Sequence, residues 1–216
     1  MAIDLEQLRA KRPLARSFYI DDDVVQISQN LLGKILVSQI NGQLTAGRIV
    51  ETEAYRAPDD QASHAANNRR TQRTETMYQI GGTAYIYLIY GLHHLFNVVT
   101  GPEDTPHAVL IRGLEPLIGI DKMLERRRLS KVKTQLSAGP GVLSQALGIN
   151  KAFDTIDLTT INSPIWITSD AYLLKKTDIE TGTRVGVAYA GIDAYRPWRF
   201  SIKNNPWVSK GKGLVK

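Results

Sequence analysis

Two carboxylates and an aromatic ring lie close together in one short, mostly apolar segment of this chain, residues 47–55. The segment is typical of a β-strand, in which side chains alternate between two faces. Glu51, Glu53 and Tyr55 therefore share one face with Ile49. Partial burial beside a second negative charge makes a carboxylate a better proton acceptor, which suits a general base acting on water. The alternative is a half-exposed strand with two solvated glutamates.

A second segment, residues 84–91, carries three tyrosines. Tyr85 and Tyr87 share a strand face, and Tyr90 falls at a turn beside Gly91. Aromatic residues on strands normally pack, and we expect this of Tyr85. A large ring at a hairpin tip has little to pack against, so Tyr90 is either an idle surface residue or a contact that wedges between bases or docks on a partner.

The histidines do not have the spacing of a metal site. His93 and His94 are adjacent, so on a strand they point to opposite faces, and no H-x-x-x-H pattern occurs. We therefore predict no zinc site and no metal cofactor. His64 lies in a long polar loop after Tyr55, where it either folds back over the site or is solvated.

Two further motifs have two readings each. Arg112 ends the apolar run 109–111, where a buried arginine needs a carboxylate or phosphate partner and an exposed one simply emerges into solvent. The Gly139-Pro140-Gly141 run either places backbone N–H groups against a phosphate or only caps a helix. It lacks the Lys-Ser/Thr of a nucleotide-binding P-loop.

Hydrophobic periodicity and turn residues predict the elements that position these residues. Asn41-Gly42 is a strong hairpin signal between two strands, and the polar stretch 56–82 is too long for an idle connection. We expect helices at 24–32, 116–129 and 142–147, strands at 34–40, 43–55, 83–89, 95–100 and 107–112, and short strands around Trp166, Val185 and Arg199.

Helices and strands mix without βαβ regularity, which predicts an α+β fold. We expect one domain over residues 1–216, with a curved, mainly antiparallel sheet, flanking helices and a protruding β-hairpin. Neither a repeat nor a linker-like tract interrupts the sequence, and residues 1–17 are expected to be a loosely ordered N-terminal segment.

Composition narrows the function classes. The chain has 216 residues, no cysteine and a formal net charge of +6. The absence of cysteine excludes disulfides and thiolate metal sites and fits a reducing compartment. No apolar run is long enough to span a membrane, and the N-terminus lacks a secretory signal. The charge favours a polyanionic partner, with basic clusters at 67–73, 125–128 and 210–212.

Taken together, these segments resemble the alkyladenine (3-methyladenine) DNA glycosylase family. The resemblance covers residues 18–209 and is carried by four runs in family order, with weaker support from Leu31-Leu32-Gly33 and Ser137-Ala138-Gly139-Pro140. The four runs are 47–55 (GRIVETEAY), 85–91 (YIYLIYG), 109–116 (VLIRGLEP) and 199–209 (RFSIKNNPWVS).

The resemblance implies an enzyme of base-excision repair that binds duplex DNA as a monomer and needs no cofactor. It swings a damaged purine into a pocket and hydrolyses the N-glycosidic bond, leaving an abasic site. Glu53 is implied as the base that activates water, assisted by Arg112. The implied pocket residues are Tyr55, His64, Tyr87 and Asn97, and Tyr90 is implied as the wedge that fills the gap in the base stack. A cytoplasmic location is expected, or a nuclear one in a eukaryote.

Three other functions fit parts of the pattern. A non-catalytic nucleic-acid-binding module would use the same basic face and aromatic rings. A bifunctional glycosylase would form a Schiff base through a lysine, and a nucleosidase would cleave free nucleosides. Within the glycosylase hypothesis, 3-methyladenine, 7-methylguanine, hypoxanthine and ethenoadenine all remain open as the preferred lesion.

Overall fold

The computed structural model describes residue 8 and residues 11–215 of the chain. One sheet organises these residues, and all of its pairings between named strands are antiparallel. The strand order is β3-β4-β5-β2-β1-β6, with β8 paired to both β2 and β7. The strands are β1 (Ile35–Ile40), β2 (Gln43–Arg56), β3 (Ala84–Ile89), β4 (His93–Thr100), β5 (His107–Ile118), β6 (Ile165–Thr168), β7 (Ile179–Gly182) and β8 (Arg199–Ile202).

Strand β2 is the central element, and its two ends pair with different strands. Residues 43–48 of β2 pair with β1, and residues 46–56 pair with β5. Residues 51–53 pair with β8 as well. The pairing with β5 shifts register between Ile49 and Glu51 and again between Glu51 and Thr52. Such bulges bend a strand and re-aim its side chains. The irregularity flanks Glu51, the first of the two carboxylates.

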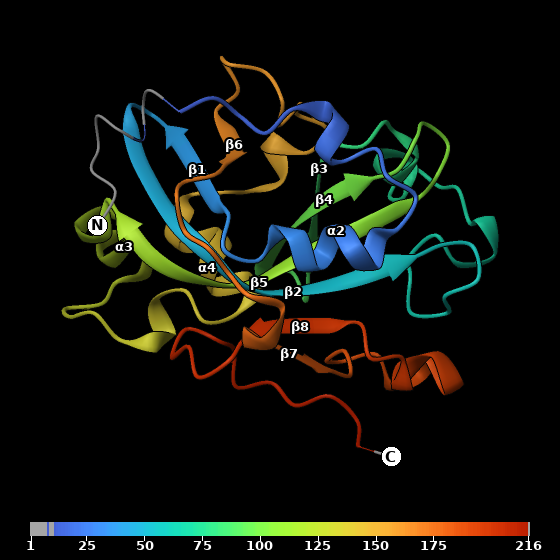
Figure 1. Ribbon diagram of the computed structural model, residues 1–216. Helices are drawn as coiled ribbons and strands as arrows, with labels where there is room; N and C mark the ends of the chain where they lie inside the picture. Colours follow the sequence, from blue (N-terminus) through green and yellow to red (C-terminus); the bar gives the residue numbers. More distant parts are fainter. Residues whose placement is uncertain (1–7, 9–10, 216) are drawn as a thin grey trace.

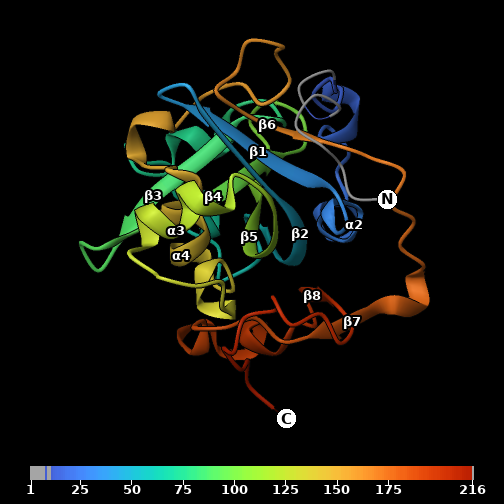
Figure 2. The ribbon, with the colours of Figure 1, turned by 90° about the vertical axis from the view of Figure 1, so that its left-hand side faces the viewer.

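The helices are α2 (Val24–Leu31), α3 (Ile120–Arg127) and α4 (Pro140–Leu147). Figure 1 shows α2 crossing in front of β2, and Figure 2 shows α3 and α4 on the other side. Helix α2 begins where the Asp23 side chain accepts a hydrogen bond from the Gln26 N–H. Its buried residues Val24, Ile27 and Leu31 join the largest apolar cluster, which fixes β2 from this face.

Two tight turns shape the sheet. Asn41 and Gly42 both have positive φ, 52° and 73°, as the hairpin between β1 and β2 requires. Tyr90 and Gly91 also have positive φ, 53° and 68°, at the tip of the β3–β4 hairpin. This hairpin extends beyond the body of the molecule (Figure 2), so the tip side chains have few neighbours.

The α+β class, the mainly antiparallel sheet, the flanking helices and the protruding hairpin are confirmed. Two predicted elements are wrong in detail. The predicted helix 116–129 starts only at Ile120, because residues 116–118 continue β5 and Gly119 turns the chain with φ 72°. The predicted strand around Val185 lies earlier, at β7. Gly139-Pro140-Gly141 opens α4, with Pro140 as its first residue.

The single-domain assignment stays a prediction. The expectation of a loosely ordered segment at 1–17 stays a prediction, and residues 1–7, 9 and 10 of it lie outside the described part of the chain. None of the helices in the described part combines the length and the apolar character that a membrane crossing requires.

Candidate active site

The carboxylates of β2 are inside the protein. Glu51 and Glu53 are both 0% exposed, so the reading of a strand with two solvated glutamates is wrong. Burying an ionised carboxylate is costly unless hydrogen bonds and opposite charges compensate it. The partners of these two side chains therefore determine what each can do.

Glu53 accepts hydrogen bonds from three donors. Its Oε1 accepts from the Val185 N–H at 2.7 Å, and its Oε2 accepts from the Tyr55 hydroxyl at 2.8 Å and from Arg112 Nη1 at 3.2 Å. A carboxylate offers about four acceptor positions. Among the described residues, three of these positions on Glu53 are therefore filled, one on Oε1 and two on Oε2.

Arg112 is a buried partner of both carboxylates and does not emerge into solvent. Burial disfavours its charged form, but the neighbouring charges of Glu53 and Glu51 outweigh this effect and raise the pKa of Arg112. The guanidinium is therefore a permanent positive charge at the floor of the site.

Beside these groups lies a cavity of about 340 Å³, a size usual for small-molecule sites. Six of the seven side chains predicted from the sequence line it, and Glu53 lies beneath it, bonded to two of them. The six are Tyr55, His64, Tyr87, Tyr90, Asn97 and Arg112. Residues from β2, β3, β4, β5 and the long polar loop thus meet at one place.

Neutral aromatic side chains form part of the cavity wall. Tyr87 meets the His64 ring edge-on with centroids 4.7 Å apart, and His64 Nδ1 lies 2.9 Å from the Tyr85 hydroxyl. Burial and the nearby Arg73 and Arg69 lower the pKa of His64 to about 4, so it is neutral at pH 7. Burial likewise raises the pKa of Tyr85 to about 12, which keeps its hydroxyl protonated.

Tyr55 and Asn97 are held in place by hydrogen bonds. Burial and the charge of Glu53 raise the pKa of Tyr55 well above its usual value, so its hydroxyl remains a donor to Glu53. Asn97 is buried, and its Nδ2 donates to the carbonyls of Tyr85 and Leu95. The loop histidine does fold back over the site, and Tyr85 is a packed residue with an additional polar contact.

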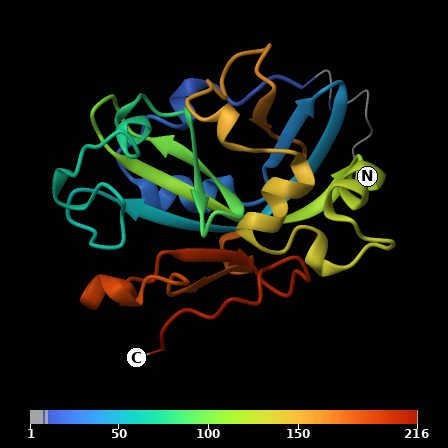
Figure 3. The same cartoon turned by 180° about the vertical axis from the view of Figure 1, so that it is seen from behind.

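Tyr90 lies at the rim. It is 85% exposed at the hairpin tip, although part of its ring borders the cavity. Seen from behind, the hairpin tip and the segment Ala188–Tyr195 both belong to the side of the molecule that faces the viewer (Figure 3). Tyr189, from that segment, also borders the cavity.

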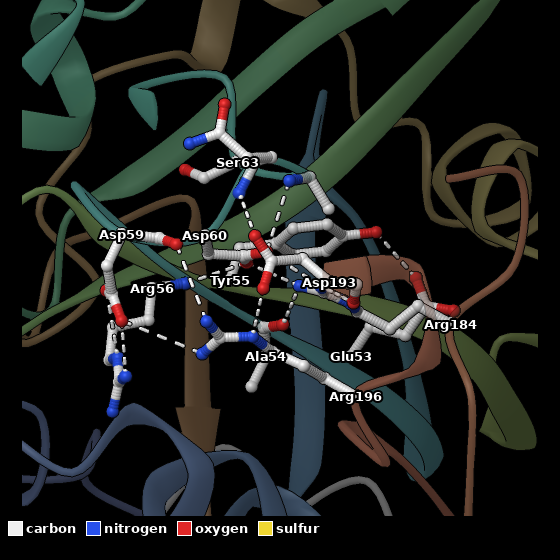
Figure 4. A network of polar contacts seen from close by, with 12 residues as sticks. Glu53, Ala54, Tyr55, Arg56, Asp59, Asp60, Ser63, Arg184, Asp193 and Arg196 are labelled. Carbon is white, nitrogen blue, oxygen red and sulfur yellow. Dashed lines mark hydrogen bonds and ion pairs between the residues drawn. The ribbon is translucent and has the colours of Figure 1, made fainter. Parts of the chain in front are cut away.

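A buried ion pair packs against the ring of Tyr55. Arg184 donates to both oxygens of Asp60, at 2.5 and 2.8 Å, and both side chains are 0% exposed. The Arg184 guanidinium lies 4.9 Å from the centre of the Tyr55 ring. Figure 4 shows this pair within a larger network that also includes Arg196 and Asp193.

Local sequence patterns do not predict several residues that complete the site. Val185, Arg199 and Ser209 come from the C-terminal segment and contact the glutamates of β2. Arg73 belongs to a predicted basic cluster, but its position over the Tyr87 ring, 5.1 Å from the centroid, follows only from the loop fold. Arg199 and Ser209 lie in the run 199–209, which carries the family resemblance but does not show that these residues pair with the glutamates.

In the described part of the chain, no group of three or more His, Asp or Glu side chains is arranged to hold a metal ion. The independence from metals and organic cofactors stays a prediction.

Comparison with known proteins identifies the family. The profile of the family described as Methylpurine-DNA glycosylase (MPG) matches residues 17–206. The chain belongs to this family. Relatives with the name "Putative 3-methyladenine DNA glycosylase" occur in several bacteria. The relative from Chlamydia felis is 47% identical over 88% of this chain and 95% of its own length.

Two further relatives carry the same name. The protein from Natranaerobius thermophilus is 42% identical over 88% of this chain and 96% of its own, and that from Clostridium perfringens is 43% identical over 91% and 98%. Membership makes the chain a hydrolase of the N-glycosidic bond of damaged DNA bases. The predicted family, enzyme class and role in DNA repair are therefore confirmed.

Proposed function

We propose that the chain excises alkylated purines from duplex DNA as a monofunctional glycosylase, with Glu53 activating the attacking water. The observation that carries this proposal is the state of Glu53. It is fully buried, bonded to Tyr55 and Arg112 at the cavity, and has an acceptor position to spare. A base in such a position can take a proton from a water aimed at the sugar of a bound nucleotide.

The aromatic wall offsets the cost of extruding a base. Flipping a purine out of the stack costs a few kcal/mol, and stacking on an aromatic ring returns about 1–3 kcal/mol. Tyr55 and Tyr87 both line the cavity and can supply this stacking. Alkylation at N3 or N7 makes a purine cationic, so electron-rich rings bind it more tightly than a normal base. The neutral His64 does not repel this cation.

The reaction follows from the same charges. Glu53 accepts a proton from water while the water oxygen forms a bond to C1′ of the deoxyribose. The C1′–N bond breaks, and its electron pair neutralises the cationic purine, which leaves as a neutral base. An abasic site remains. Arg112 holds Glu53 in position and balances its charge.

Tyr90 fits the role of the wedge, because a ring with 85% exposure at the rim of the cavity can enter the space left by the flipped base. Two hydrogen bonds to backbone carbonyls fix the Asn97 side chain at the cavity wall. A fixed side chain can discriminate between purines that differ in the groups along one edge. The proposed substrate is double-stranded DNA that contains a damaged purine.

The test is product analysis with the Glu53→Gln variant on methylated duplex DNA. We expect the wild type to release methylated purines and leave abasic sites, and the variant to bind the same duplex without releasing bases. Glu115→Gln is the control, because Glu115 lies on the neighbouring strand β5 and accepts a hydrogen bond from Asn205, whereas Glu53 is bonded to residues that line the cavity. Near-normal excision by Glu53→Gln contradicts the mechanism.

Product analysis, borohydride trapping and free nucleosides as substrates distinguish the three other functions. A binding module retains DNA in a salt-dependent manner but yields no abasic product. A lysine Schiff base leaves a covalent adduct that borohydride traps, and a nucleosidase cleaves free nucleosides without a duplex. Action as a monomer and a cytoplasmic or nuclear location stay predictions.

A further inference from the structure

Glu51 is the buried carboxylate that the proposed mechanism does not use. It lies two residues before Glu53 on β2, is 0% exposed and does not border the cavity. Its Oε1 accepts from Arg112 Nε at 3.0 Å, Arg199 Nε at 2.7 Å and Ser209 Oγ at 2.9 Å, and its Oε2 accepts from the Ser209 N–H at 2.7 Å. Glu51 thus receives four hydrogen bonds, one more than Glu53, and three of the four fall on Oε1.

These contacts divide the guanidinium of Arg112 between two carboxylates. The Nε edge donates to Glu51, whereas only Nη1 reaches Glu53, at 3.2 Å, and Nη2 donates to Ser209 Oγ at 3.3 Å. A guanidinium readily makes two parallel hydrogen bonds with a single carboxylate. Held by Glu51, Arg112 makes one hydrogen bond with Glu53.

From this geometry we infer that Glu51 is a positioning residue for the reaction. It restrains Arg112 so that only Nη1 donates to Glu53, which leaves Glu53 an acceptor position for the proton of a water. This role rests on the proposed function of Glu53 as the base. Glu51 also neutralises Arg199, whose charge otherwise adds to that of Arg112 beside Glu53.

The charged and titratable groups near Glu53 determine how a substitution of Glu51 alters the pH dependence of the reaction. Arg112 and Arg184 act on it as cations. Three tyrosines also face it, from β2, β3 and the segment Ala188–Tyr195; they are Tyr55, Tyr87 and Tyr189. Their raised pKa values keep all three neutral near pH 7. The charges that act on Glu53 are therefore those of Glu51, the two arginines and Arg199, which is the register partner of Glu53 on β8.

The test compares Glu51→Gln with the wild type by single-turnover excision on methylated duplex DNA between pH 4 and 8. Without the charge of Glu51, Arg112 and Arg199 stabilise ionised Glu53 more strongly. We expect the acid limb of the pH–rate profile to move down by about one pH unit and the plateau rate to fall about tenfold. Affinity for a duplex with a non-cleavable abasic analogue should stay within about twofold, because Glu51 does not touch the cavity.

Asp170→Asn is the matched control. Asp170 forms a largely buried pair with Arg48, also on β2, at 2.8 Å, and it lies outside the cavity. This variant is expected to lose stability without moving the acid limb, and Glu51→Asp, which keeps the charge, to restore part of the wild-type profile.

A purely structural role predicts that Glu51→Gln behaves as Asp170→Asn does, with an unmoved limb and a rate that falls only with the folded fraction. That result overturns the inference. If Glu51→Gln does not fold, Ser209→Ala removes one hydrogen bond each from Glu51 and Arg112 and is expected to shift the limb less but in the same direction; an unmoved limb again overturns it. Near-normal excision by Glu53→Gln, in contrast, contradicts the proposed function itself.

Discussion

Two glutamates two positions apart on one strand differ in chemistry because of the donors around them. Glu51 is surrounded by donors from Arg112, Arg199 and Ser209, whereas Glu53 receives three hydrogen bonds and lies under the cavity. The spacing in the sequence places both carboxylates on one face but cannot distinguish them. The distinction comes from a segment more than a hundred residues further along the chain, for which no local periodicity exists.

His64 provides a prediction about pH and stability. Its folded pKa of about 4 lies below its usual value of 6.5, because burial, Arg73 and Arg69 disfavour its charged form. Between these values the unfolded chain binds more protons than the folded one, so stability falls as the pH drops from 6.5 toward 4. At pH 5 this effect costs about 1–2 kcal/mol.

The measurement is urea denaturation of the wild type and His64→Gln at pH 7 and pH 5. Other groups titrate equally in both proteins, so the wild type should lose about 1–2 kcal/mol more than the variant over this interval. Equal losses would show that His64 ionises in the folded protein as it does in the unfolded chain.

At the scale of elements, the hairpins follow directly from their sequences. Asn41-Gly42 forms a turn with positive φ, as both residue types favour, whereas in Tyr90-Gly91 only the glycine favours it. The helix predicted from Pro116 is wrong in its start because proline also suits the first position of a helix, and pairing of β5 with β2 decides otherwise. Strand pairing of this kind is a long-range effect that a local pattern does not contain.

The β3–β4 hairpin carries the prediction for Tyr90. Replacing Tyr90 by Ser removes the ring from an 85% exposed site, so stability should hardly change. If the ring fills the gap left by a flipped base, loss of stacking worth about 1–3 kcal/mol weakens binding to a lesion in a duplex by about tenfold or more. Binding to the same lesion in single-stranded DNA should change little.

Leu92→Ser is the control for this experiment, because Leu92 is 77% exposed on the same hairpin tip but does not border the cavity. Fluorescence anisotropy with duplex and single-stranded oligonucleotides gives the six affinities, two each for the wild type, Tyr90→Ser and Leu92→Ser. Equal losses on both substrates for Tyr90→Ser would argue against a wedge.

Across the whole molecule, the site depends on the attachment of the C-terminal segment to β2. In Figures 1 and 3 this segment lies as a separate layer below the rest of the sheet, with β8 against β2. The α+β class follows from local patterns, and six of the seven residues implied by the family resemblance line one cavity. The layer itself cannot be predicted from local patterns, because β7 and β8 are only four residues each and their pairing is non-local.

The Arg184–Asp60 pair joins this layer to the loop after β2. Besides Asp60, Arg184 donates to the carbonyls of Ala54 and Asp193, at 2.9 and 3.0 Å, so one buried side chain connects three segments. Removing one partner of a buried pair leaves an uncompensated charge, at a cost of about 3–5 kcal/mol. We expect Asp60→Asn to lower the free energy of unfolding by this amount.

Asp59→Asn is the matched control, because the neighbouring carboxylate pairs with Arg56 and Arg196 but is 48% exposed. Such exposed pairs contribute about 0–1 kcal/mol, so chemical denaturation should separate the two variants clearly. The double variant Asp60→Leu/Arg184→Met removes both charges and should be more stable than Asp60→Asn. If instead Asp60→Asn and Asp59→Asn unfold at the same denaturant concentration, the C-terminal layer is held by its strand pairing and apolar contacts, and the buried pair does not attach it.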